Sequence, residues 1–290
     1  MNLALPLRKF PLDWAGEPSL MEHRLITLTT DFGHQDPFVG IMKGVIFSIN
    51  PNARIIDLSH GIPPQDIRAG ALALCRSAPF FPRGTIHVAV VDPGVGSERR
   101  PILIEAGGVF FVGPDNGILS LAGEGKRVNW IIDLSDDTYH LKPTSATFHG
   151  RDIFAPVAAH LSLGIPASEF GEPAKDYVRL RLPEIVRSAG AIQGEVLYID
   201  SFGNLVTNIR ERDLQAIQPQ NSSISLGNVT IHGISPNYSS ARQNDYVAVI
   251  NSWGLLEISC FKGNAHHRSG ANTGDRVEVR LGKDDRGQTP

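Results

Sequence analysis

Two polar segments of the sequence carry residues that could hold a reactive water molecule or move its proton. Residues 91–100 (VDPGVGSERR) begin at the end of an apolar run, so Asp92 ends a strand and Arg99 returns a cation toward it. A carboxylate beside an arginine keeps its charge and can orient water, although the same pair can also clamp an ordinary loop. Residues 147–152 (TFHGRD) place His149 before a predicted helix, where it could exchange a proton near neutral pH or serve only in packing.

Other polar segments are suited to recognising a small molecule. Asp31 ends an apolar run, and a carboxylate after the first strand of an α/β sheet can accept two hydrogen bonds from a vicinal diol, or can cap the helix that follows. Residues 200–204 (DSFGN) place an aromatic ring beside an amide, a combination that could stack on a base and bind its edge. The same residue types also form ordinary β-turns. Residues 251–254 (NSWG), followed by Glu257, add a hydroxyl at another strand end.

The first half of the chain alternates strand and helix patterns. Strands are predicted at 25–30, 54–58, 85–91, 102–105 and 109–112, and helices at 38–50, 65–77 and 152–162. This order predicts an α/β N-terminal domain with a mostly parallel sheet. Ligands bind open α/β sheets at the carboxyl ends of the strands, which is where Asp31 and Asp92 lie.

The second half of the chain has short β-rich runs separated by Gly, Asn and Ser, which predicts an all-β C-terminal barrel domain. These runs lie at 194–199, 205–209, 229–231, 246–250 and 276–281. We therefore predict an N-terminal extension, the α/β domain, a linker, the β-barrel domain and a tail, at residues 1–22, 23–182, 183–192, 193–284 and 285–290.

Composition excludes several classes of protein. The 290 residues include 27 Lys and Arg against 30 Asp and Glu, a formal net charge of −3, which argues against a surface that coats nucleic acid or a polybasic membrane patch. Two cysteines are too few for a disulfide framework or a Cys-based zinc site. No apolar run reaches the ~18 residues of a membrane helix, and no P-loop, G-x-G-x-x-G, H-E-x-x-H, C-x-x-C or G-x-S-x-G motif occurs. We expect a cytoplasmic protein that binds neither nucleic acid nor membrane.

Six segments, in order along the chain, resemble the S-adenosyl-L-methionine (SAM) hydrolase family, which forms adenosine and is also called the SAM hydroxide adenosyltransferase family. The segments read TTDFG, VDPGVGxxRR, GPDNG, FHGRD, DxFGN and NSxG. The resemblance runs from about Ile26 to Val279 and extends to the related fluorinating and chlorinating enzymes. It implies an α/β domain joined to a β-barrel, and a homotrimer whose substrate sits between one subunit's N-terminal domain and a neighbour's C-terminal domain.

The resemblance also implies a role for each motif residue. The catalytic Asp, Arg and His of the family match Asp92, Arg99 and His149, and its ribose-binding Asp matches Asp31. The face that binds methionine and adenine matches Asp200, Phe202, Asn204, Ser252 and Glu257, and the positions that line the pocket match Phe81 and Phe148. SAM is then the substrate, and the reaction needs no cofactor and no metal.

The implied reaction is attack of water at C5′ of SAM, in line with the C–S bond, which releases methionine and leaves adenosine. The halogenating relatives differ, because Trp253 stands where they have an arginine, and Gly84 and Gly150 stand where they have hydroxyl side chains. Three alternatives stay open. They are a halide-using enzyme, a non-catalytic module that binds SAM or adenosine, and a metal-dependent hydrolase that uses Asp31, Asp92 and Asp200.

Overall fold

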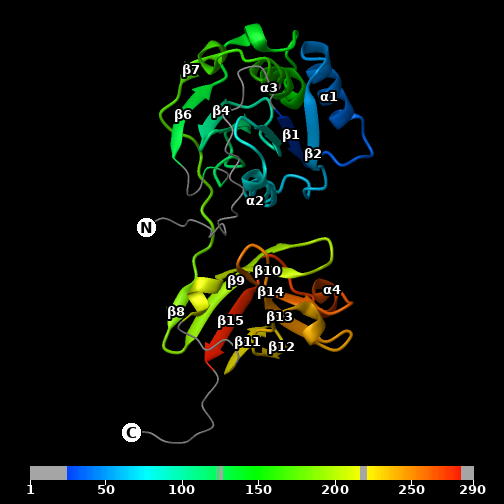
Figure 1. The fold of residues 1–290 in the computed structure, drawn as a ribbon, viewed down its shortest axis with the longest axis vertical. Helices are drawn as coiled ribbons and strands as arrows, with labels where there is room; N and C mark the ends of the chain where they lie inside the picture. The colour runs from blue at the N-terminus through cyan, green and yellow to red at the C-terminus, as the bar shows by residue number, and fades with distance from the viewer. Residues whose placement is uncertain (1–24, 122, 124–126, 216–220, 282–290) are drawn as a thin grey trace, which may run out of the picture. The chain divides into compact units, whose positions relative to one another are not determined.

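The computed structural model of the protein describes residues 25–121, 123, 127–215 and 221–281 (Figure 1). They divide into two compact units, the first ending at Leu180 and the second beginning at Arg181. The predicted extension at 1–22 and the predicted tail at 285–290 lie outside the described residues.

A mixed sheet forms the centre of the first unit (Figure 1). In spatial order its strands are β2 (Arg54–Ser59), β1 (Leu25–Thr30), β3 (Ile86–Val90), β5 (Val109–Pro114), β4 (Pro101–Ala106), β6 (Val128–Asp133) and β7 (Glu172–Pro173). Strands β2, β1, β3 and β5 run parallel, whereas β4, β6 and β7 are added antiparallel. The α/β prediction is confirmed. The antiparallel part begins at a tight hairpin between β4 and β5, where Gly107 and Gly108 both have positive φ.

Helices cover both faces of this sheet (Figure 1). Helices α1 (Phe38–Ile49) and α3 (Ala155–Ser162) pack on one face, and α2 (Ile67–Ser77) packs on the other. Successive residues of β3 point to opposite faces, so Val88 packs in the core with α1 and α3, while Ala89 packs in the core with α2. Strand β3 is therefore buried on both faces, as its unbroken apolar run predicts.

The helix predicted at 152–162 begins differently from an ordinary helix. A π-helical turn, Gly150–Phe154, precedes α3 and starts directly after His149. Such turns occur often at functional sites, because they shift the direction of the side chains at the helix start. Short 3₁₀ helices lie at Ala78–Phe80, Asp137–Tyr139, Ala167–Phe170, Glu211–Leu214 and Tyr238–Ser240. Within the described residues, no helix combines the length and apolar character needed to cross a membrane.

The second unit is an antiparallel, nearly closed barrel, which confirms the predicted all-β domain. Its strands, in spatial order, are β12 (Val229–His232), β11 (Ser222–Leu226), β15 (Arg276–Leu281), β9 (Ala191–Ile199), β10 (Leu205–Arg210), β14 (Leu255–Cys260) and β13 (Tyr246–Ile250). Ser235, just after β12, forms a bridge to Val249 of β13 and so links the two end strands. Strand β8 (Val186–Ser188), within the segment predicted as a linker, pairs with β9, and helix α4 spans Ala265–Ser269.

Candidate active site

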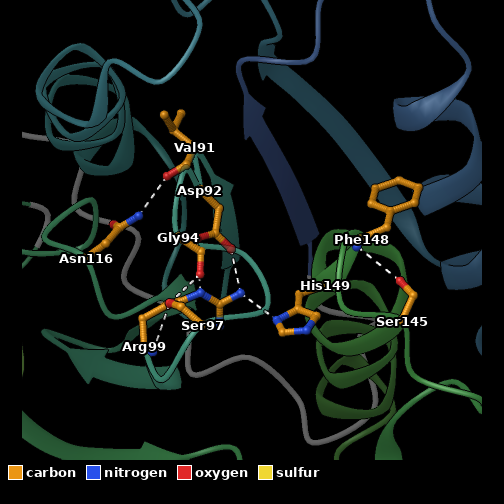
Figure 2. Close-up of polar contacts among 9 residues, drawn as sticks. All are labelled: Val91, Asp92, Gly94, Ser97, Arg99, Asn116, Ser145, Phe148 and His149. Carbon is orange, nitrogen blue, oxygen red and sulfur yellow. Dashed lines mark hydrogen bonds and ion pairs between the residues drawn. The ribbon is translucent and has the colours of Figure 1, made fainter.

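Asp92, Arg99 and His149 form one hydrogen-bonded cluster in the first unit (Figure 2). Arg99 binds Asp92 with two donors, Nε to Oδ1 at 3.0 Å and Nη2 to Oδ2 at 2.5 Å. The same Nη2 donates to Nδ1 of His149 at 2.6 Å. The side chains of Asp92 and Arg99 are only 4% and 8% exposed. The structure thus brings the three predicted catalytic residues together around one guanidinium, largely removed from bulk water.

Local hydrogen bonds shape the loop that carries Asp92 and Arg99 (Figure 2). The Ser97 hydroxyl donates to the carbonyl of Gly94 at 2.6 Å, which tightens the turn between the two charged residues. At the start of the loop, the Asn116 amide donates to the carbonyl of Val91 at 2.8 Å. The GPDNG segment therefore holds the end of β3 in place, a role that its sequence alone does not reveal.

Gly96 brings the loop against the segment that carries His149. It has a φ of +76°, and a Cβ atom built on it would collide with the carbonyl oxygen of Ala146. Only glycine tolerates both this backbone conformation and this close approach. Arg99 and His149 are 50 residues apart in the sequence, and the Gly96–Ala146 contact is the point where their two loops meet.

His149 is held in one protonation state by its neighbours. Arginine has donors but no acceptor, so Nδ1 of His149 must be the acceptor in their contact, and the proton of the neutral ring lies on Nε2. Burial lowers the pKa of His149, and the positive charge of Arg99 lowers it further. The imidazole is therefore neutral at pH 7, and its Nε2–H is a donor.

One guanidinium nitrogen of Arg99 takes no part in the hydrogen bonds to Asp92 and His149. Its Nη1 is buried and has no hydrogen-bond partner among the described residues. The guanidinium lies 5.4 Å from the ring centre of Phe154, which helps to hold its plane. A buried cationic donor without a partner is costly, so this atom marks where an oxygen atom would be stabilised.

Phe148 belongs to an aromatic wall beside the cluster. Its ring packs against Phe32 and Phe38, with ring centres 5.9 Å and 5.3 Å away, and the Arg151 guanidinium lies over it. Its backbone N–H donates to the Ser145 hydroxyl (Figure 2). Because Phe32 directly follows Asp31, the wall connects the His149 turn with the end of β1.

Asp31 lies at that strand end, half-buried, with one carboxylate oxygen engaged. Its Oδ2 accepts a hydrogen bond of 2.8 Å from the backbone N–H of Gln65. Its Oδ1 makes no hydrogen bond to the described residues.

Phe81, by contrast, packs edge-on against His87 near the start of β3, whereas Asp92 follows the other end of that strand. The structure therefore does not bring Phe81 to the cluster.

In the second unit, the 200–204 loop is held by its own aspartate. Asp200 accepts backbone hydrogen bonds from Phe202 and Asn204, both at 2.9 Å, and a third bond from the Asn204 side chain at 2.8 Å. Gly203, with a φ of +81°, packs so closely on Asn264 that a Cβ atom would collide with it. This rigid turn leaves the Phe202 side chain 74% exposed.

Glu257 lies on the face of β14 opposite to the barrel core, because the adjacent Leu256 and Ile258 pack in that core. Its carboxylate is buried and accepts hydrogen bonds from Tyr238 at 2.9 Å, Ser259 at 2.8 Å and Asn251 at 3.0 Å. The side-chain oxygen Oδ1 of Asn251 in turn accepts from the backbone N–H of Trp253, which shapes the NSWG turn around the exposed Ser252. Glu257 thus supports the NSWG turn through its hydrogen bond with the Asn251 side chain.

Comparison with known proteins shows the family to which the chain belongs. The family models described as SAM hydroxide adenosyltransferase N-terminal and C-terminal domains match residues 26–171 and 194–278. The chain belongs to the SAM hydroxide adenosyltransferase family. Proteins named (R)-S-adenosyl-L-methionine hydrolase from Salinispora tropica and Methanocaldococcus jannaschii are 36% and 37% identical to it, over 89% and 88% of this chain and 98% and 95% of theirs.

More distant relatives and solved structures extend the comparison. A fluorinase from Actinoplanes is 28% identical over 81% of this chain and 90% of its own. The crystal structure of an uncharacterised conserved protein from Thermotoga maritima is 33% identical, with a TM-score of 0.83 over 88% of this chain and 100% of that one. The family predicted from the six motifs is confirmed.

The structure adds Tyr238 to the candidate residues of this family member. Tyr238 is 42% exposed as a residue, while its hydroxyl donates to Glu257. Burial and the bond to Glu257 raise the pKa of Tyr238 to about 12, and the charge of Asp200 contributes to the rise. Nothing in the surrounding sequence, PNYSS, distinguishes this tyrosine from an ordinary loop residue.

Metal ligation was one of the alternatives left open. Across the part of the chain that the structure describes, no group of three or more His, Cys, Asp or Glu side chains could hold a metal ion. The cation next to Asp92 is Arg99 itself.

Proposed function

We propose that this protein hydrolyses SAM to adenosine and L-methionine. The observation that carries the proposal is the buried Asp92–Arg99–His149 cluster, in a chain whose relatives at 35–37% identity are named SAM hydrolases. The sulfonium of SAM is already a good leaving group. Catalysis therefore needs only a nucleophile held in line behind the C5′–S bond.

Arg99 supplies the charge that favours the nucleophile. The attacking water binds at Nη1, the buried donor that has no partner among the residues described, and the positive charge stabilises its hydroxide form. In a site removed from bulk water, the same charge distribution draws the anionic oxygen toward the cationic substrate. The step requires neither a metal nor another cofactor.

Asp92 takes the proton of the water, and His149 orients the oxygen. Each carboxylate oxygen of Asp92 uses one lone pair on Arg99 and keeps another. The basic nitrogen of His149 is occupied by Arg99, so this ring acts as a donor through Nε2–H. General base catalysis of this kind is worth about 10²–10⁴-fold in rate.

The remaining predicted residues bind the substrate. Asp31 accepts hydrogen bonds from the ribose diol, and Phe148 lines the pocket. In the second unit, the carboxylate of Asp200 attracts the methionine ammonium, Phe202 and Asn204 bind adenine, and Ser252 binds the carboxylate. Glu257 acts indirectly, because it accepts hydrogen bonds from Asn251 and Tyr238 and so positions the Asn251 turn and the Tyr238 ring. Phe81 stays a prediction from the resemblance alone.

We further propose that the enzyme is a homotrimer, because its binding residues are divided between two units and the family resemblance combines them from neighbouring subunits. Light scattering of the active protein tests this, and an active monomer contradicts it. The cytoplasmic location stays a prediction from the sequence.

A product assay tests the proposed reaction. Incubation of SAM in ¹⁸O-labelled water should yield equal amounts of methionine and adenosine, with the label on the adenosine 5′-hydroxyl. Added chelator should change nothing, and chloride should not divert the product to a 5′-halo nucleoside. Absence of turnover supports the binding module, inhibition by chelator supports the metal hydrolase, and a halogenated product supports the halide-using enzyme.

A further inference from the structure

A buried histidine, His60, is hydrogen-bonded to the chain on both sides of Asp31. His60 follows β2 and is 1% exposed, and its Nδ1 lies 2.8 Å from the hydroxyl of Thr30, the residue before Asp31. Its backbone carbonyl accepts a hydrogen bond of 2.8 Å from Gly33, two residues after Asp31. One residue of the neighbouring loop therefore holds the chain on either side of this carboxylate.

The hydrogen bonds around His60 have a consistent direction. The Thr30 oxygen accepts from the backbone N–H of Phe32 at 3.2 Å, which leaves its own proton for Nδ1 of His60. Nε2 of His60 lies 3.0 Å from Asp57 Oδ1, and the other oxygen of Asp57 accepts from Lys43 at 2.6 Å. With Nδ1 as the acceptor from Thr30, Nε2 faces the Asp57 carboxylate, a close contact that does not reach hydrogen-bond geometry.

The loop that begins at His60 then returns to Asp31 itself. The N–H of Gln65 donates to Asp31 Oδ2, and Gln65 has a φ of +65°, a conformation that costs energy for a residue with a side chain. Asp31 is thus fixed at one oxygen, while the other has no hydrogen-bond partner in the part of the chain that the structure describes. Local strain at such a place is common where a ligand group must be positioned.

We infer that Thr30 and His60 are positioning residues that aim the free oxygen of Asp31 at the 2′,3′-diol of the ribose. This inference rests on the proposed function and deepens it, because it assigns recognition of the diol to a network that starts in a different loop. Neither residue touches the substrate. They act through the backbone of Asp31.

The same strand supplies a matched control. Thr27 also lies on β1 and its hydroxyl is 2.7 Å from Nδ1 of another buried histidine, His87. That pair has the same chemistry as Thr30–His60 but lies three residues earlier, and no hydrogen bond between the described residues joins Thr27 to the Asp31 loop. Removing either threonine hydroxyl with valine is close to isosteric, so the two variants differ mainly in position.

The test compares the binding of adenosine and 2′,3′-dideoxyadenosine by calorimetry in the purified full chain. The parent should prefer adenosine, and Asp31→Ala should abolish the preference. Thr30→Val should reduce it by about 3–10-fold, the value of one net hydrogen bond, whereas Thr27→Val should leave it unchanged. Thr30→Val should have no further effect in the Asp31→Ala background, because residues that act through one another are not additive.

A second variant protects the test against a folding defect. His60→Ala should behave like Thr30→Val, and His60→Asn should restore part of the preference, since its amide oxygen can accept from Thr30. Thermal unfolding of each variant is recorded alongside. A parent-like preference in Thr30→Val, an equal loss in Thr27→Val, or a parent without preference overturns the inference. A parent that binds adenosine but does not hydrolyse SAM overturns only the proposed function.

Discussion

The two units hold their candidate functional residues in opposite ways. In the first unit the charged groups are buried and bound to one another, with Asp92 only 4% exposed beside Arg99. In the second unit the loop at 200–204 satisfies its own backbone and leaves Phe202 74% exposed. Chemistry on a water molecule needs fixed charges in a site of low dielectric, whereas recognition needs a rigid surface that is free to be covered.

The difference predicts which substitutions affect rate and which affect binding. Changes in the first unit's cluster should lower kcat, because its groups act mainly in the transition state. Changes in the loop at 200–204 should raise KM, because they remove contacts that substrate and transition state share.

The largest effect is expected for Asp92→Asn, which keeps the shape but removes the base. Its single-turnover rate on SAM should fall by about 10²–10⁴-fold, with little change in calorimetric binding. Ser97→Ala, in the same loop, keeps Asp92, Arg99 and His149 and should lose far less. His149→Gln should retain more activity than Asp92→Asn, because an amide can still donate as Nε2–H does. A parent-like rate in Asp92→Asn would place the base elsewhere.

Gly96→Ala should have the next largest effect, because it separates the two loops without touching a charged residue. The added Cβ meets the Ala146 carbonyl in a backbone conformation that costs roughly 1–2 kcal/mol for a residue with a side chain. We expect a loss in kcat on the order of 10-fold and a lower Tm. Gly94→Ala is the control, since its Cβ would find its nearest neighbour, Ser97, at 3.4 Å. Equal behaviour of the two variants would show that the close approach is not needed.

A smaller effect is expected for Phe202→Ala in the second unit. Loss of an exposed stacking surface should raise KM for SAM by about 3–10-fold, the value of roughly 0.5–1.5 kcal/mol, and leave kcat unchanged. Val186→Ala, at another exposed apolar residue of this unit, should change neither constant. A fall in kcat for Phe202→Ala would contradict the division between the units.

The smallest effect concerns pH near neutrality. Because burial and Arg99 lower the pKa of His149 below its usual 6.5, the ring stays neutral as pH falls to that value. It gains its proton only in more acidic solution. In the protonated ring, Nδ1 carries a proton that faces the Nη2 donor of Arg99, so the hydrogen bond between the two residues would be lost. The rate should therefore not change with His149 protonation around pH 7 and should fall only below pH 6.5, and this acid limb should weaken in His149→Gln. An acid limb centred above pH 6.5 would contradict the neutral assignment.

Local sequence determined much of the fold. The strands at 25–30 and 246–250 were predictable residue for residue, because their apolar, β-branched runs stop at turn-forming residues. Strands β6, β11 and β14 were not predicted. Strand β14 reads LLEISC and is buried throughout, although its residues alternate between apolar and polar from Leu256 to Cys260, a pattern that by itself indicates one exposed face. The burial of Glu257 depends on hydrogen bonds from Tyr238 and Asn251, which lie outside this strand, as well as from Ser259.

The same distinction applies to the candidate site. Asp92 and Arg99 lie seven residues apart, so a single tight loop makes their pairing predictable, and the six motifs were sufficient to identify the family. Only the tertiary structure places His149 on Arg99, fixes its proton on Nε2 and brings His60 behind Asp31. It also separates Phe81 from the cluster and anchors Tyr238 on Glu257. Sequence spacing reports contacts made within one loop, whereas contacts between loops depend on how helices and strands pack, and that depends on the whole chain.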